Sequence, residues 1–189
     1  MARLQSLSPR DARRFRTGRP SLDLIHTGGE GIYEVFELLH QPDDVAKWLG
    51  VIADVDGVHA TRGDIEAVRA LRGAVEGAAR AAIDGRQASA ADRAVINAAA
   101  AQPPVVPVLD DQGRTTTSGP VTVDQVLSTL ARDAIDLFSG SLASRIRTCA
   151  ADDCGMFFVD QSRPGTRRWC SMQRCGTLAK VRAHRARNT

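Results

Sequence analysis

Near the end of the chain, residues 149–175 read CAADDCGMFFVDQSRPGTRRWCSMQRC, and this segment decides how the C-terminal part folds. All four cysteines of the 189-residue chain lie in it, as two C-x4-C pairs separated by fifteen residues. Two such pairs can complete a tetrahedron around one zinc ion, with zinc–sulfur distances of roughly 2.3 Å. The predicted ligands of one structural Zn²⁺ per chain are Cys149, Cys154, Cys170 and Cys175. Four protein ligands leave no position for a catalytic water, so we expect the ion to be structural.

Other uses of the four thiols stay open at this stage. Two disulfides would allow three pairings, the thiols could be free and buried, or an iron–sulfur cluster could take the place of zinc. The N-terminus has no apolar segment of the kind found in secretion signals, and no run of about 18 apolar residues predicts a membrane span. We therefore expect a cytoplasmic protein without membrane contact, in which clustered cysteines are more often metal ligands than disulfides.

The segment around the cysteines is too small to fold securely on its own apolar surface. A module of about 45 residues needs a staple, and metal binding then supplies folding free energy. We expect a hairpin from residues 145–148 and 156–160 around the first cysteine pair, and a helix from Cys175 to about Arg187. A hairpin, a metal-binding turn and a helix that opens at the second pair resemble a treble-clef arrangement.

The region before the cysteines has a mainly helical pattern, because apolar residues recur at steps of three and four. Helices are predicted over 32–39, 43–57, 64–84, 89–101 and 122–137. A turn at 110–113 should join two short strands, 105–109 and 114–118. The predicted fold is mainly α: a helical N-terminal domain with one β-hairpin, followed by a small treble-clef-like zinc finger. The predicted divisions are a flexible basic arm (1–20), the helical domain (21–140) and the finger (141–189).

Charge is distributed unevenly along the chain, whose net charge is +3. Residues 145–189 carry ten Lys or Arg against three Asp, a net charge of +7. Residues 1–20 carry six Arg against one Asp, and the residues between these two ends have a net charge of −9. A basic end on an acidic body indicates a polyanionic partner, although a basic tail that meets only solvent is the alternative.

The basic residues of the finger are candidate contacts with nucleic acid, because guanidinium groups match phosphate oxygens. The predicted contact residues are Arg163, Arg167, Arg168, Arg174, Lys180, Arg182, His184 and Arg187. Lys180, His184 and Arg187 should share one face of the terminal helix, whereas Leu178 and Val181 should pack inward. The alternative is that cations simply complement the helix C-terminus, which leaves the arginines before Trp169 unexplained. Trp169 itself should either stack on a base or pack over the metal loop.

Several motifs of the finger are longer than the cysteine pattern alone: Cys154-Gly155, Phe158–Asp160, Arg167–Met172, Cys175-Gly176 and Ala179–Arg182. With them the C-terminal segment resembles the CGNR zinc-finger family. Upstream, residues 22–27 (LDLIHT) and Trp48-Leu49 resemble the ABATE domain that usually precedes this finger. The resemblance implies four cysteine ligands to zinc and a role as a stress-related transcription regulator.

The chain departs from the name-giving motif of that family. After Cys175-Gly176 the family has Asn and Arg, and Thr177 and Leu178 stand here. Thr177 can cap a helix as Asn would, whereas Leu178 removes a cation and weakens the expectation of phosphate contact. His26 stands where the family often has Asn.

The predicted function is a transcription regulator whose finger binds nucleic acid, with DNA favoured, and whose helical domain senses a small-molecule signal or mediates self-association. The alternatives are an RNA-binding or protein-interaction adaptor, and a small-molecule-binding protein with a purely structural finger. Asp23 and His26, close to Gly28 and Gly29, are candidate ligand-pocket residues, or else they satisfy local backbone groups. No nucleophile–base constellation is apparent in the sequence, so we do not expect an enzyme.

Overall fold

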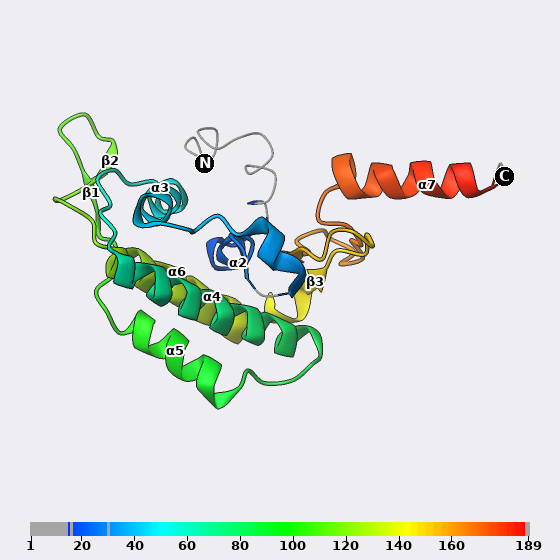
Figure 1. Ribbon diagram of the computed structural model, residues 1–189, viewed down its shortest axis with the longest axis horizontal. Helices are drawn as coiled ribbons and strands as arrows, with labels where there is room; N and C mark the ends of the chain where they lie inside the picture. The colour runs from blue at the N-terminus through cyan, green and yellow to red at the C-terminus, as the bar shows by residue number, and fades with distance from the viewer. Residues whose placement is uncertain (1–14, 16, 30, 188–189) are drawn as a thin grey trace.

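The structure, a computed structural model, describes residues 15, 17–29 and 31–187 (Figure 1). It confirms the mainly α prediction. Three helices pack on one another to form most of the body: α4 (Arg62–Ile83), α5 (Ala90–Ala100) and α6 (Val123–Ser139). The hairpin of β1 (Pro107–Leu109) and β2 (Thr115–Thr117) lies at one end of these helices, and the cysteine-containing segment lies at the other (Figure 1).

Each central helix begins at a side-chain cap, which is why the sequence predicts their starts well. Thr61 and Asp64 form a capping box at α4, the Ser89 hydroxyl accepts the Asp92 N–H at α5, and α6 begins with the predicted Thr122–Gln125 box. The buried faces of α4 and α6 consist mostly of Ile, Val, Leu and Ala, with Val68, Val75, Val126 and Leu137 fully buried. These faces form the main apolar core.

The segment between residues 20 and 53 differs from its prediction. A short helix, α2 (Pro20–Ile25), is buried from its second residue onward. Residues 31–36 form a 3-10 helix (η2, Gly31–Phe36) in place of the expected helix over 32–39. The chain leaves the helical path because the Leu38 N–H donates to the Thr27 carbonyl at 2.7 Å, which folds this segment back on α2. Val35, predicted to be apolar contact surface, is 82% exposed.

Helix α3 (Pro42–Ala53) begins at Pro42, one residue before the start predicted from the sequence. Proline is well accommodated in the first turn, since its missing N–H needs no partner there. Gln41 is the N-cap, in a capping box with Asp44, and Asp43 lies in the first turn of the helix. Pro42 therefore marks the start of α3.

The last residues of the predicted flexible arm are packed against the body, so that prediction is wrong for this part; residues 1–14 and 16 lie outside the described residues. Phe15 is buried, with its ring 5.8 Å from that of Trp48. Thr17 is also buried, and its carbonyl accepts the Val159 N–H at 2.8 Å. Arg19 pairs with Asp133 at 2.9 Å. An aromatic ring and a partly buried ion pair thus attach this segment.

The second hairpin, β3 (Ile146–Thr148) and β4 (Phe157–Val159), connects the cysteine-containing segment to the helices. The strands are antiparallel, with Ile146 opposite Val159. A single turn of 3-10 helix, η3 (Ala143–Arg145), directly precedes β3. Ile146, Phe157 and Val159 belong to the main core, whereas Phe158 packs with the cysteines. The apolar core therefore continues past residue 140, where the sequence predicted the helical domain to end.

Candidate metal centre and nucleic-acid interface

The first cysteine pair lies in the turn that joins β3 to β4. The Cys149 N–H donates to the Met156 carbonyl at 2.8 Å, and the Cys154 N–H donates to the Ala151 carbonyl at 3.1 Å. Gly155 follows with a φ of +63°, a left-handed conformation that favours glycine. This turn directs both sulfur atoms to the same side.

The second pair brackets the start of the C-terminal helix. The Ala150 N–H donates to the Arg168 carbonyl at 2.8 Å, which places the segment before Cys170 beside the first turn. From Cys170 the chain enters a π-helical turn, η4 (Met172–Gly176), that contains Cys175 and continues into α7 (Thr177–Arg187). A Cβ at Gly176 would lie 2.7 Å from the Met172 sulfur, so the Met172 side chain packs directly against the backbone of Gly176.

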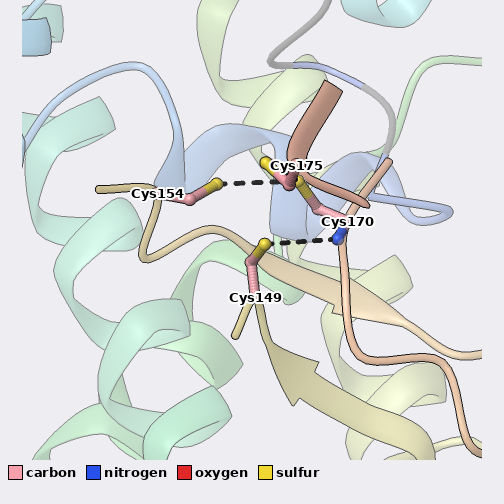
Figure 2. A group of neighbouring side chains, drawn as sticks. All are labelled: Cys149, Cys154, Cys170 and Cys175. Atoms are coloured by element: carbon pink, nitrogen blue, oxygen red, sulfur yellow. Dashed lines mark hydrogen bonds between the residues drawn. The ribbon is translucent and has the colours of Figure 1, made fainter. Parts of the chain in front are cut away.

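All four sulfur atoms converge on one point (Figure 2) and lie within 4.8 Å of one another. The sulfurs of Cys154 and Cys175 lie 3.6 and 3.7 Å from that of Cys170. A tetrahedron with zinc–sulfur distances of about 2.3 Å has sulfur–sulfur edges of about 3.8 Å. A disulfide needs about 2.05 Å, and all four cysteines are free, so the disulfide alternative is excluded.

The protonation of the cluster also indicates a cation. The thiol of Cys170 donates toward Cys154, which lowers the pKa of Cys154 to about 5 and raises that of Cys170 well above its usual range. Burial raises the pKa of Cys175 to about 12. Among these three cysteines, Cys154 is the favoured thiolate, and a divalent ion would balance the charge of further thiolates. Zinc, which prefers thiolates, fits this donor set.

Comparison with known families agrees with this geometry. Residues 18–141, most of the chain, match the model of the ABATE family, described as "Putative stress-induced transcription regulator". The chain belongs to the ABATE family. Residues 145–188 match the CGNR zinc finger, and with the four-cysteine cluster this match identifies the cofactor as a structural zinc ion.

The predicted division of this ABATE protein at residues 140 and 141 stays a prediction. No curated protein sequence matches the chain. Within residues 15, 17–29 and 31–187, no helix has the length and apolar character needed to cross a membrane.

A buried carboxylate orders the loop of the CGNR finger that leads to the second cysteine pair. Asp160 accepts the hydroxyl of Ser162 at 2.6 Å, the N–H of Ser162 at 3.0 Å and the N–H of Arg167 at 2.8 Å. The Ser162 hydroxyl and these N–H groups hold the pKa of Asp160 below its usual value. Asp160 therefore acts as a fixed acceptor that shapes residues 160–167.

Arg167, predicted to contact nucleic acid, has a structural role. Its Nε donates to the Trp169 carbonyl at 2.8 Å, and a terminal N–H donates to the Cys170 carbonyl. The guanidinium also lies 4.7 Å from the centre of the Phe158 ring. These contacts hold its charged group over the metal loop, and its assignment as a phosphate contact stays a prediction. The sequence spacing gave no sign of this, because the three partners meet only in the folded loop.

The other arginines of the finger lie on its surface. Arg163, Arg168 and Arg174 are exposed, and the Arg168 guanidinium lies 5.3 Å from the centre of the Trp169 ring. Trp169 packs against the cysteine cluster, as one of its two predicted roles requires. Arg182 is exposed too, but it pairs with Asp153 at 3.1 Å. That pair joins α7 to the first cysteine turn.

Helix α7 projects from the finger away from the helical body (Figure 1). Lys180, His184 and Arg187 are exposed on one face, as the helical spacing predicts. Leu178 and Val181 are 45% and 41% exposed, so the prediction that they pack inward is wrong. The reason is that α7 extends beyond the body and has no core to face.

Thr177 does not cap this helix. It has helical dihedral angles, and its hydroxyl donates to the Met172 carbonyl at 2.9 Å. Because η4 runs directly into α7, the helix has no free first turn at Thr177 to be capped. The expectation that Thr177 replaces a capping Asn is therefore wrong.

Asp23 and His26, the candidate ligand-pocket residues, are both buried and both bonded to backbone groups. Asp23 accepts the Thr17 N–H at 3.1 Å, and burial raises its pKa to about 7. The Nε2 atom of His26 lies 3.2 Å from both the nitrogen and the oxygen of Phe157 in β4. Their observed contacts therefore attach the N-terminal segment and the finger to α2.

A buried ion pair was missed by sequence reasoning. Arg72, on α4, is buried and donates to Glu37 at 2.7 Å and to the Thr27 hydroxyl at 3.2 Å. Its partners lie 35 and 45 residues earlier in the chain. Helical periodicity around Arg72 could not reveal them.

Proposed function

We propose that this protein is a transcription regulator that binds DNA through α7 and the exposed arginines of its zinc finger. The observation that carries the proposal is the position of α7. A helix that projects from the body, with Lys180, His184 and Arg187 on one exposed face, is available to a polyanion.

Charge supports the same surface. The finger segment 145–189 has a net charge of +7, whereas residues 21–144 have a net charge of −9. A phosphate backbone is therefore attracted to the finger and repelled by the helical body. Such a distribution orients the protein on a nucleic acid before any specific contact forms.

The shape of α7 favours DNA over duplex RNA. The major groove of B-form DNA, about 12 Å wide, admits an α-helix, whereas the deep and narrow major groove of A-form RNA does not. The eleven residues of α7 span about 16 Å at 1.5 Å per residue. Leu178 and Val181, exposed on this helix, can make apolar contacts with thymine methyl groups.

The zinc centre contributes rigidity to this interface. Cys175 lies in η4, which continues without a break into α7, so a metal ion at the cluster fixes the start of the helix. The Arg182–Asp153 pair adds a second link to the first cysteine turn. The finger is then a preformed binding element and has no catalytic role. The proposal includes a cytoplasmic location, where such thiolates stay reduced.

Fluorescence anisotropy tests the proposal with a labelled duplex DNA and the duplex RNA of the same sequence. Affinity for DNA should fall linearly with salt on logarithmic axes, with a slope of about −0.9 for each phosphate contact. Lys180→Gln and Arg187→Gln should each reduce the magnitude of that slope by about one. Arg62→Gln, at an exposed position at the start of α4, is the matched control and should leave the slope unchanged.

Absence of DNA binding at low salt would refute the proposal. Tighter binding of duplex RNA would favour the RNA-binding alternative. If Lys180→Gln, Arg187→Gln and Arg62→Gln all had the same effect, the interface would lie elsewhere.

A further inference from the structure

A cavity of about 460 Å³ lies where the loop between α4 and α5 meets the end of α6. Pockets for small organic ligands have volumes of about 300–1,000 Å³, so this cavity has the size of a small-molecule site. Much of its lining is apolar: Ala78, Ala82, Ile96, Ile135, Phe138 and Ala143. Ile135 is 39% exposed, so the apolar lining reaches the surface.

The charged groups in the lining of this cavity all have one sign. Arg86 and Arg93 line it, and none of the described lining residues is acidic. This is unexpected in residues 21–144, whose net charge is −9. The larger groove along α4, of about 920 Å³, is different, because four glutamates line it beside three arginines. An anion is thus favoured in the smaller cavity and opposed in the larger one.

Arg93 is better placed than Arg86 to receive an anionic group. A guanidinium has five N–H donors, and Arg93 donates one of its terminal N–H groups to the Ala88 carbonyl. Arg86 already pairs with Asp84 at 2.7 Å, although both side chains are exposed and such pairs are weak. Asn97, one turn beyond Arg93 on α5, is exposed and adds an amide to the same lining.

The cavity also touches the connection between the two family-matched parts of the chain. Ala143 and Ser144 line it, and they lie between residues 18–141 and 145–188. Both residues belong to η3, which runs directly into β3 of the finger. The carbonyl of the next residue, Arg145, accepts the Asp160 N–H at 2.9 Å in the loop before the second cysteine pair. A ligand here would contact the segment that positions the finger.

We propose that this cavity binds a small amphipathic carboxylate, with its apolar part against Ala82 and Ile96 and its carboxylate on Arg93. The inference adds to the proposed DNA binding the signal-sensing role that the sequence predicts for the helical domain, and it rests on the proposed function only for the link between ligand and regulation. Binding itself requires only the cavity and its charge. Occupancy would favour one arrangement of η3 and, through it, of the finger.

Isothermal titration calorimetry of the full-length zinc-loaded protein tests this, with 2-naphthoate as the probe and neutral 2-naphthamide as its isostere. We expect saturable 2-naphthoate binding, at least about tenfold tighter than that of the amide, because a charge-assisted pair with Arg93 forms only with the acid. Arg93→Gln should weaken binding of the acid about tenfold. Asn97→Trp, an exposed substitution that fills the cavity mouth, should abolish binding.

Arg62→Gln, an exposed arginine of the same body that does not line the cavity, is the matched control and should bind 2-naphthoate as the wild type does. Circular dichroism checks that each variant is folded. If Asn97→Trp does not fold, Arg93→Gln alone tests the inference. Lack of saturable binding by the wild type, equal affinity for the amide, or equal losses in Arg93→Gln and Arg62→Gln would overturn the inference. DNA affinity measured without ligand separates it from the proposed function, since Arg93→Gln should bind DNA normally.

Discussion

The Nε2 atom of His26 lies 3.2 Å from the backbone nitrogen of Phe157, a residue 131 positions later in the chain. The two rings also stack, with their centres 6.1 Å apart. His26 ends α2 at the centre of the helical body, and Phe157 begins β4 of the finger. This contact is buried, so the finger is attached to the body by a specific hydrogen bond in addition to the shared core.

Replacing His26 tests that attachment. His26→Ala removes the acceptor of the buried Phe157 N–H, and an unsatisfied buried donor costs about 1–3 kcal/mol of unfolding free energy. Urea denaturation followed by circular dichroism measures the loss. The exposed His40 provides the control, and His40→Ala should change stability by less than about 0.5 kcal/mol. Equal losses in the two variants would show that the contact does not stabilise the fold.

Removal of zinc should loosen the finger and leave the helical body folded. The cysteine cluster and Trp169 depend on the ion, whereas Trp48 is buried in the main core with its own apolar contacts. In a Trp48→Phe variant, a chelator should shift the Trp169 emission to longer wavelength while the helical circular dichroism signal remains largely intact. Elemental analysis should find one zinc per chain before chelation. Unchanged emission after complete zinc loss would contradict the structural role of the ion.

Two neighbouring arginines should have opposite phenotypes. Arg167→Gln loses the hydrogen bonds to the Trp169 and Cys170 carbonyls, so we expect about 1–3 kcal/mol of destabilisation and weaker zinc retention in a chelator competition. Arg168→Gln changes an exposed side chain, so stability should hold within about 0.5 kcal/mol while DNA affinity falls at low salt. If Arg167→Gln lowered DNA affinity without loss of stability and Arg168→Gln did the opposite, Arg167 would belong to the nucleic-acid interface.

Asp23 should make the protein less stable as pH rises from about 4 to about 7. Burial raises its folded-state pKa from 3.8 to about 7, so in this window the folded chain binds a proton that the unfolded chain has released. The unfolding free energy attributable to Asp23 therefore decreases with rising pH, by a total on the order of 4 kcal/mol. Asp23→Asn keeps an acceptor for the Thr17 N–H and should remove this decrease.

Urea denaturation of both proteins between pH 5 and pH 8 isolates the effect of Asp23, because all other groups are shared. The pKa of Glu37 lies outside this pH range. Although burial opposes it, hydrogen bonds from Arg72 and the Leu39 N–H hold the pKa of Glu37 below 4.5, so its contribution is lost only as pH falls below that value. A constant stability difference between wild type and Asp23→Asn across the range would mean that Asp23 stays ionised throughout.

The predictions that the structure confirms rest on patterns of residues that are close together in the sequence. Capping residues such as Ser89 and Thr122 act on backbone groups only three positions away, so their helices were recognisable from the sequence. The paired C-x4-C spacing likewise brings two thiolates together within a single turn, and the strands on either side of the first turn followed from short apolar runs. A four-cysteine metal centre in a basic module was thus determined by residues close together in the chain.

Only the tertiary structure decided what the individual charged and apolar side chains do. Arg72 is buried because Glu37 and Thr27 come to it from distant positions, and Leu178 is exposed because α7 leaves the body. His26 bonds to a strand 131 residues away. The cavity beside Arg93 likewise exists only where α4, α5, α6 and η3 meet. A local pattern specifies how a segment folds, but a partner that is distant in sequence is specified only when the packed core brings the two together.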